Sequence, residues 1–482
     1  MKKLITLVSI LLCHMAMQGQ YYVSDALRYS QNFPTLTARS MSMGNAFTSL
    51  GGDFSSAFIN PAGLGLYRKS EFQFSPGLGY SGIKTTYNGE KNDDYKYHFI
   101  LSSMGYVGTY ISGKDKGLVS ASYAVGYNRL NNFQNNTYIK GDNTSSAFAD
   151  YFWDNADGND PDSLDVFAER LAFDAYVIDT IPGTAFEYFN VVGNLPVTQQ
   201  KIIETTGGTG EWSFGFGLNF SNIMYVGMGL GIYQLNYSQK NITSEFDDYN
   251  LNDFSFYHFT EDLDVKGTGF SLKMGLMLRP VEFLRIGASL HLPTFYRIEE
   301  VFTNSMYSEF DNGFIPSEEV GGIYAEGTYV YKLHTPLKLM GGASIQIGKS
   351  GIVAADIEYI DYSNMRLREK DILLNSRESN RTIEDVYRKV VNLKLGGELR
   401  FGNLSLRAGG GLYPSPYTSD ELNKNAGYGE LTTGLGYRDS NFFFDLGFSA
   451  LFNEEKYNLY FNNVADMDQS KYRFIGTIGF RF

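Results

Sequence analysis

The chain has 482 residues, a formal net charge of −13 at pH 7, 16% aromatic residues, 52 glycines and one cysteine. Its mean hydropathy is −0.23. No run of about 18 consecutive apolar residues occurs, which excludes membrane-spanning helices. The acidic balance argues against a nucleic-acid partner, because phosphate backbones are bound by basic surfaces.

Residues 1–20 have the features of a secretory signal peptide. Two lysines follow the initiating methionine, residues 4–12 are apolar, and small or polar residues lie near Gln20, where we place the cleavage site. The only cysteine, Cys13, lies inside this segment, and Leu12 before it is too large for a lipoprotein signal. The mature chain is therefore expected to have neither disulfides nor thiol chemistry.

Residues 21–68 do not alternate between apolar and polar positions as a strand would. Small residues and residues that cap helices are closely spaced here, which predicts a compact segment with short helices. From residue 69 to residue 482 the pattern changes to about fourteen strand-length segments. The clearest is Val391 to Phe401, where apolar residues alternate with Asn392, Lys394, Glu398 and Arg400.

The connections between these segments alternate between short and long. The short ones are turn sequences near residues 113–116, 221–222, 279–282, 348–350, 402–403 and 438–440. The long ones are polar and cover residues 85–94, 134–211, 241–263, 299–323, 363–389, 414–426 and 453–471. Single strands of this kind could also belong to a soluble β-sandwich, but a sandwich explains neither the signal peptide nor the regular alternation of connection lengths.

These features predict an all-β chain: a transmembrane antiparallel β-barrel of about 14 strands over residues 69–482, in the cell outer membrane. A barrel of this width needs something in its lumen, so residues 21–68 are predicted to be an N-terminal hatch, or plug, inside it. The last strand ends on the aromatic Phe482, which resembles the signal by which barrel-assembly machinery recognises its clients. We expect a monomer surrounded by outer-membrane lipid.

Charged residues on the predicted inward faces of the strands are expected to pair with one another in the lumen. The candidates are Asp356, Glu358, Lys394, Glu398 and Arg400. Basic residues such as Arg473 and Arg481 could instead hold a ligand carboxylate, but pairing within the lumen is the favoured interpretation.

The connection over residues 134–211 is too long for a loop without structure of its own. A sequence beginning at Ser163 places Leu164, Phe167 and Leu171 on one face of a predicted amphipathic helix. With Phe152 and Trp153, these residues form a candidate external hydrophobic site. The alternative is a loop that folds over the barrel mouth and buries its aromatic residues.

One block of the predicted hatch carries a resemblance to a known family. It consists of the run from Ala38 to Ala46, which includes Gly44, then Asp53, and then Asn60, Pro61, Ala62, Gly63 and Leu64. Thr335–Lys338, Gly341–Ala343 and Asp356–Tyr359 match further along. Together they resemble the FadL/TodX family of outer-membrane hydrophobic-compound transporters. Asn60 and Pro61 by themselves could simply set the turn from the hatch into the wall.

The resemblance implies passive uptake of long-chain fatty acids or aromatic hydrocarbons. In that family the ligand lands on apolar external loops, moves to a lumen gated by the hatch, and leaves sideways through the wall. The main alternative is a non-transporting outer-membrane scaffold or cargo shuttle of a type IX-like secretion system. A porin for polar solutes is less favoured, because the hatch would block a wide aqueous channel.

Enzyme activity is not expected. The four histidines after the signal peptide, His98, His258, His291 and His334, show no metal-binding spacing and no nucleophile context. The glycine clusters lack the Lys-Ser/Thr that follows a phosphate-binding loop. We therefore predict no catalytic residues, no metal and no cofactor, with a hydrophobic small molecule as the ligand.

Overall fold

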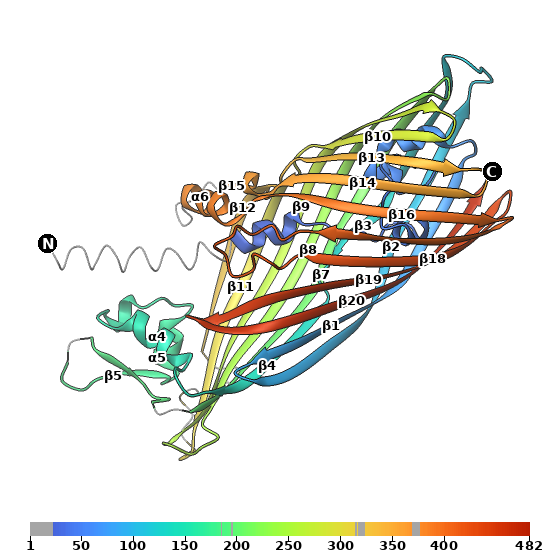
Figure 1. The fold of residues 1–482 in the computed structure, drawn as a ribbon. Coiled ribbons are helices and arrows are strands. Elements are labelled where there is room, and N and C mark those ends of the chain that lie inside the picture. Colours follow the sequence, from blue (N-terminus) through green and yellow to red (C-terminus); the bar gives the residue numbers. More distant parts are fainter. Residues whose placement is uncertain (1–22, 185, 194–195, 314–315, 317–322, 369–375) are drawn as a thin grey trace.

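The computed structural model describes residues 23–184, 186–193, 196–313, 316, 323–368 and 376–482. The predicted signal peptide lies outside these residues. Figure 1 shows a slanted barrel of antiparallel strands, which closes where the first strand pairs with the last, from Glu71 opposite Arg481 to Thr86 opposite Asp466. No helix in the described part of the chain is long and apolar enough to cross a membrane.

The barrel wall has fourteen strand positions, as the sequence predicts. Three positions are each shared by two strands in line: β10 with β11, β12 with β13, and β14 with β15. The wall strands are β1 (Glu71–Tyr87), β2 (Glu90–Ile111), β3 (Leu118–Asn132), β7 (Val197–Phe220), β8 (Met224–Phe246), β9 (Phe254–Val281), β10 (Leu284–His291), β11 (Phe295–Phe310), β12 (Ile323–His334), β13 (Lys338–Ile347), β14 (Gly351–Asp361), β15 (Arg366–Arg368), β16 (Lys389–Phe401), β17 (Leu404–Tyr413), β18 (Tyr428–Arg438), β19 (Phe442–Tyr460) and β20 (Asn463–Arg481).

Several predicted long loops are in fact strands. Residues 85–94 form a hairpin whose turn, Asn88-Gly89, has positive φ at both positions, and residues 453–471 continue β19 and β20. Within residues 134–211, β4 (Asn135–Asn143) pairs with the start of β7. The prediction was wrong here because strands that extend beyond the bilayer have polar outward faces and therefore resemble loops.

The edge of the membrane-facing surface is visible in two adjacent rows of the wall. Ile232, Phe270 and Phe295 lie side by side on β8, β9 and β11 with their side chains exposed. The next outward-facing row contains Gln234, Thr268 and Arg297 instead. Because lipid tails accept apolar side chains and water accepts polar ones, the apolar belt ends between these rows.

The inward-facing residues change along the barrel in the opposite way to the outward-facing ones, from charged within the apolar belt to apolar outside it. In the part outside the belt, inward residues such as Tyr237, Leu235, Ile298 and Tyr331 join one apolar cluster with the chain's N-terminal helix at residues 23–30. In the part within the belt, the interior contains most of the charged network described below. The molecule thus combines a membrane barrel with an outer section that has an apolar core of its own.

The remaining helices lie in two places. Inside the barrel are α2 (Ala38–Ser42), α3 (Ser56–Ile59) and the 3₁₀ helix η1 (Pro61–Leu66). Outside its open end are α4 (Ala149–Ala156), η2 (Pro161–Ser163), α5 (Glu169–Asp174), and the two-stranded sheet of β5 (Ile178–Thr180) and β6 (Tyr188–Asn190). At the same end lie η3 (Tyr362–Asn364) and α6 (Ser376–Val386).

Candidate transport path

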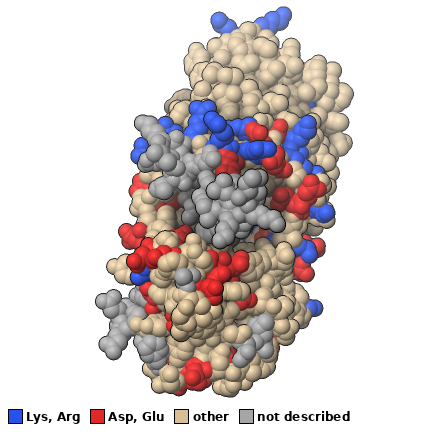
Figure 2. All heavy atoms as spheres, turned by 90° about the vertical axis from the view of Figure 1, so that its left-hand side faces the viewer, with Lys and Arg blue, Asp and Glu red and all other residues tan. Residues whose placement is uncertain are grey.

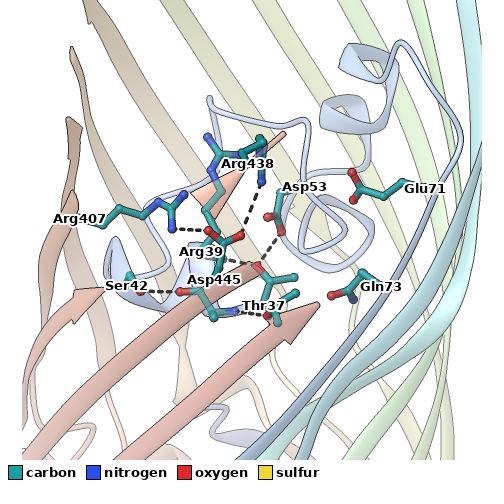
Figure 3. Close-up of polar contacts among 12 residues, drawn as sticks. Thr37, Arg39, Ser42, Asp53, Glu71, Gln73, Arg407, Arg438 and Asp445 are labelled. Carbon is teal, nitrogen blue, oxygen red and sulfur yellow. Dashed lines mark hydrogen bonds and ion pairs between the residues drawn. The ribbon is translucent and has the colours of Figure 1, made fainter. Parts of the chain in front are cut away.

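The described hatch residues, 23–67, lie inside the barrel. A group of ion pairs holds the α2 end of this segment against the wall (Figure 3). Arg39 of α2 donates to Glu398 at 3.0 Å, and Arg407 bridges Glu398 and Asp445 at 2.7 and 2.6 Å. Arg438 adds a longer contact of 3.6 Å to Asp445. Because these charges are buried, each depends on its partners to offset the loss of hydration.

The charged residues predicted for the lumen do meet there, and the structure adds hatch partners that the sequence did not reveal. Lys394 pairs with Glu358 at 2.9 Å, and Arg400 pairs with Glu398 at 2.6 Å. Asp356 accepts a hydrogen bond of 2.7 Å from the backbone N–H of Thr48 in the hatch. Of the five predicted residues, Asp356 and Glu398 therefore bind hatch groups directly, and Arg400 pairs with Glu398.

Asn60 fixes the turn that leads from α3 into η1. Its side-chain oxygen accepts from the N–H of Ala62, and its Nδ2 donates to the carbonyl of Thr48 at 2.6 Å and to that of Leu276 on β9 at 3.3 Å. Pro61 occupies the first position of η1, where its missing N–H costs nothing. The triplet thus sets a local turn and also ties the hatch to the wall.

The other predicted hatch residues are close-packing positions. Asp53 accepts from the Thr37 hydroxyl at 2.8 Å and caps the turn before α3. Gly44 has φ +61°, and a Cβ there would lie 2.6 Å from the carbonyl oxygen of Gly410 in the wall. Gly63 packs against Gly51 in the same way within the hatch.

The helix at residues 23–30 occupies the outer, apolar section of the lumen. Tyr237 lies edge-on to Tyr29 with ring centroids 6.0 Å apart, and the Tyr387 hydroxyl donates to the carbonyl of Val23. Arg28 pairs with Asp25 on the same helix and lies over the Tyr237 ring. A helix that carries its own ion pair therefore fills a chamber lined largely with tyrosines.

One acid from the wall faces this helix. Glu300 of β11 accepts a 2.6 Å hydrogen bond from the Tyr331 hydroxyl. It lies beyond the apolar belt, since Arg297 and Glu299 on the same strand face water. The pKa of Glu300 is raised to about 8: burial and then the nearby Asp25 raise it, and the Tyr331 hydrogen bond and Arg28 lower it in part. Burial also raises the pKa of Asp25, against the effect of Arg28.

The wall is interrupted between β2 and β3. Their pairing runs from Ile111 opposite Ser120 to Ser103 opposite Asn128, and the outer half of β2 then pairs with β1 alone. The hatch lies across this interruption. The N–H of Phe33 donates to the carbonyl of Leu130 on β3 at 3.0 Å, and the Ser102 hydroxyl of β2 donates to the carbonyl of Leu36. Residues 33–36 therefore connect β2 and β3 just beyond the point where the pairing of these two strands ends; we refer to this stretch as the hatch bridge.

The lipid side of the interruption carries aromatic residues. Tyr95, Tyr97 and Phe99 of β2 are all exposed, and Tyr97 retains 73% of its accessible surface. They lie on the outward face of the strand half that lacks a β3 partner. The outside of the wall at the interruption is therefore an aromatic surface.

The long connection folds into an external subdomain, residues 144–196. Phe152, Leu164 and Leu171 are buried in its core, together with Phe254 and Tyr257 from the ends of the wall strands. The predicted helix is short, with α5 covering only Glu169–Asp174, because residues 164–168 follow η2 as an irregular segment. This burial agrees with the alternative in which the loop buries its aromatic residues.

A smaller apolar surface remains on this subdomain. Trp153 is 40% exposed, and Phe167 is half-buried against Phe302 of β11. Tyr176, Phe186 and Phe189 are also exposed. Their exposure could not be read from the sequence, because buried and exposed aromatic residues alternate irregularly here. Binding of a ligand at this surface remains a prediction.

Comparisons with known proteins bear on the fold. No protein-family model matches the chain, and no curated protein matches its sequence. Solved structures do match over nearly the whole length. The toluene transporter TodX of Pseudomonas putida has 13% identity and a TM-score of 0.55, covering 94% of this chain and 99% of its own. A FadL homologue of Pseudomonas aeruginosa has 12% identity and a TM-score of 0.56, covering 94% and 100%.

The chain has the fold of the FadL and TodX channels. A third structure, the toluene transporter TbuX of Ralstonia pickettii, agrees, with 14% identity, a TM-score of 0.50 and coverage of 94% of this chain and 99% of its own. The resemblance predicted from residues 38–64 is thus confirmed at the level of the fold.

Proposed function

We propose that the protein is an outer-membrane channel for the passive uptake of hydrophobic small molecules, long-chain fatty acids or aromatic hydrocarbons. The observation that carries this proposal is the stretch of wall between β2 and β3 that lacks strand pairing and is bridged by residues 33–36. A water-filled pore does not stabilise an apolar solute, because its surface stays in contact with water. Such a solute can instead pass from an apolar chamber into lipid through a side opening.

The path begins at the external subdomain, passes the tyrosine-lined chamber around residues 23–30, and ends at the hatch bridge. Opening requires the loss of a few hydrogen bonds at residues 33–36 and not the removal of the whole hatch. The ion pairs of Arg39 and the contacts of Asn60 lie elsewhere and can stay in place during opening. Similarity to channels named for toluene and to a FadL homologue supports this choice of solute.

Uptake by cells tests the proposal. A strain that lacks this protein should take up labelled palmitate or toluene more slowly than the parent strain, and the restored gene should recover the rate. Equal rates in the two strains for both compounds would count against a transport role. A large steady conductance of the purified protein in a planar bilayer would favour a porin instead.

One observation favours the scaffold alternative. Between residues 144 and 196 the sequence has ten acidic residues and a single basic one, Arg170. Figure 2 shows acidic side chains gathered on the lower part of the open end, the side where α4 and α5 lie in Figure 1. A folded acidic surface with exposed aromatic residues is suited to a protein partner. Stoichiometric co-purification of a secreted protein, lost when residues 144–196 are removed, would support the scaffold.

A further inference from the structure

Basic side chains gather on the outside of the wall where the apolar belt ends. The first outward-facing row beyond the belt contains Gln234 on β8 and Thr268 on β9. Arg297 of β11 stands opposite Thr268, and Lys332 of β12 stands opposite Arg297. Arg368 of β15 follows opposite Lys332. Three neighbouring strand positions therefore carry cations at one level, and we refer to Arg297, Lys332 and Arg368 as the basic row.

The basic row points away from the lumen. All three of its side chains are exposed. Ile298, Leu333 and Leu367, which are adjacent to them in the chain, are buried in the apolar cluster that fills the outer section of the barrel. Because side chains alternate between the two faces of a strand, the basic row lies on the outer face, next to the surrounding membrane.

The basic row lies at the end of the apolar belt that carries the long connections. From Arg297, β11 continues away from the belt to Phe310, which packs against the external subdomain. In transmembrane barrels the short turns face the periplasm and the long connections face the outside of the cell. The three cations are therefore at the level of the lipid head groups of the outer leaflet.

The basic row has no counter-charge of its own within the described part of the chain, where its side chains form neither ion pairs nor hydrogen bonds. Arg366, one row nearer the belt, differs, since it pairs with Glu384 of α6 at 2.7 Å. Glu299, two residues beyond Arg297 on β11, stands opposite another cation, Lys266 of β9. An anion from the surroundings can therefore bind the basic row without displacing an internal partner.

Charges on another side of the barrel are mixed instead. Lys84 of β1 stands between Asp93 of β2 and Asp468 of β20, and all three are exposed. Figure 2 shows a related asymmetry across the open end, with basic side chains in its upper part, where β12, β15 and α6 lie in Figure 1, and acidic ones below. A general preference of long cationic side chains for the membrane boundary applies to every strand. Their concentration on three adjacent strands therefore indicates a local anionic partner.

A groove of about 390 Å³ adjoins the basic row on the outer face of the wall. The exposed side chains that line it come from β8, β9 and β11: Gln234, Asn236, Lys266, Thr268, Arg297 and Glu299. Amide and hydroxyl groups can donate to and accept from the hydroxyls of a sugar, and the guanidinium group of arginine matches the oxygens of a phosphate. A groove of this kind beside a row of cations suits a sugar that carries phosphate.

We propose that the basic row and the adjoining groove bind the head group of a phosphorylated glycolipid of the outer leaflet. Its phosphates contact the basic row, and its sugar occupies the groove. Its acyl chains then lie along the apolar belt, where Ile232, Phe270 and Phe295 are exposed side by side. The inference does not depend on the proposed function, because it concerns the outer face of the wall and not the lumen.

Binding of diphosphoryl lipid A to the purified protein in a neutral maltoside detergent tests this inference. The wild-type protein should bind it at least about tenfold more tightly than the same glycolipid without its phosphates, because charge-assisted hydrogen bonds to phosphate are lost in the latter. The triple variant Arg297→Gln, Lys332→Gln and Arg368→Gln should lose this preference. Heat-dependent gel migration establishes that each variant is a folded barrel.

Two matched comparisons separate the basic row from charge and size in general. Lys114→Gln, Lys116→Gln and Lys349→Gln together change the net charge by the same amount at exposed turns and should keep the preference. Thr268→Glu places a carboxylate beside the basic row and should weaken binding of diphosphoryl lipid A, whereas Thr268→Gln should not. A preference that persists in both the triple variant and Thr268→Glu would overturn the inference. Equal affinity of the wild-type protein for phosphatidylglycerol would overturn the choice of a glycolipid.

Discussion

At the scale of single residues, the hatch is held by polar contacts that a sequence pattern reveals only in part. The block around Asn60 marks the position of the turn, and the structure shows that the same side chain also reaches Leu276 in the wall. Arg39 lies in the run that carries the family resemblance, but nothing in the sequence indicates that it joins the hatch to Glu398. Such partners are hundreds of residues apart, so local spacing carries no signal of their pairing.

Replacing Asn60 with alanine should loosen the hatch without unfolding the barrel. The change removes bonds to the carbonyls of Thr48 and Leu276 and the cap on Ala62. Buried groups left without partners cost about 1–3 kcal/mol. Hydrogen exchange of residues 45–63 should therefore accelerate, while exchange of the wall strands stays constant. Asn403→Ala in an exposed turn is the control, and equal protection in both variants would contradict this role.

At the scale of elements, the strands within the bilayer are predictable because lipid on one side and a charged lumen on the other impose a strict alternation. The same rule does not apply outside the apolar belt. Beyond Phe270 the outward residues of β9 become polar and the inward ones apolar, so the predicted strand began late, at Asp264 instead of Phe254. The bridging role of Phe33 was likewise invisible, because it depends on backbone groups.

The docking of the helix at residues 23–30 should depend on pH through Glu300. Its pKa is raised to about 8 by burial and by Asp25. Because the pKa of Glu300 is higher in the docked state, the docked state holds the proton more tightly and is stabilised at low pH. This stabilisation is lost as the pH rises from about 4.5 to 8. A spin label on this helix should therefore become more mobile between pH 5 and 9. Glu300→Gln should flatten that dependence; an unchanged pH profile in the variant would exclude Glu300 as the cause.

The external subdomain should depend on one buried acid at the end of β8. Glu245 accepts from the N–H groups of Phe148 and Ala149 at the start of α4 and from the hydroxyl of Tyr257. Glu245→Ala removes these bonds and a fourth from the side chain of Gln199, so we expect cleavage within residues 144–196 by trypsin or chymotrypsin to accelerate about tenfold or more. The control is Asp248→Asn, at an exposed position close to Glu245 in the sequence, which should leave the cleavage rate unchanged. Resistance equal to wild type in Glu245→Ala would show that the apolar core alone holds the subdomain.

At the scale of the whole molecule, the chain is a membrane barrel joined to a water-exposed barrel section, with one N-terminal segment passing through both. Its helix at residues 23–30 fills the outer chamber, the hatch bridge closes the side of the wall, and α2 to η1 fill the interior between the membrane-spanning strands. We propose that a side opening forms at the hatch bridge while the ends of the segment remain fixed, and that hydrophobic solutes pass through it.

A reversible cross-link across the hatch bridge tests whether solutes take this route. The mature chain is expected to be free of cysteine, so Leu36→Cys with Ser102→Cys introduces a single pair where the hatch contacts β2. Uptake of labelled palmitate and toluene should stop when the pair is oxidised and recover on reduction, while each single variant stays active. Unimpaired uptake by the fully oxidised protein would show that hydrophobic solutes do not pass through this part of the wall.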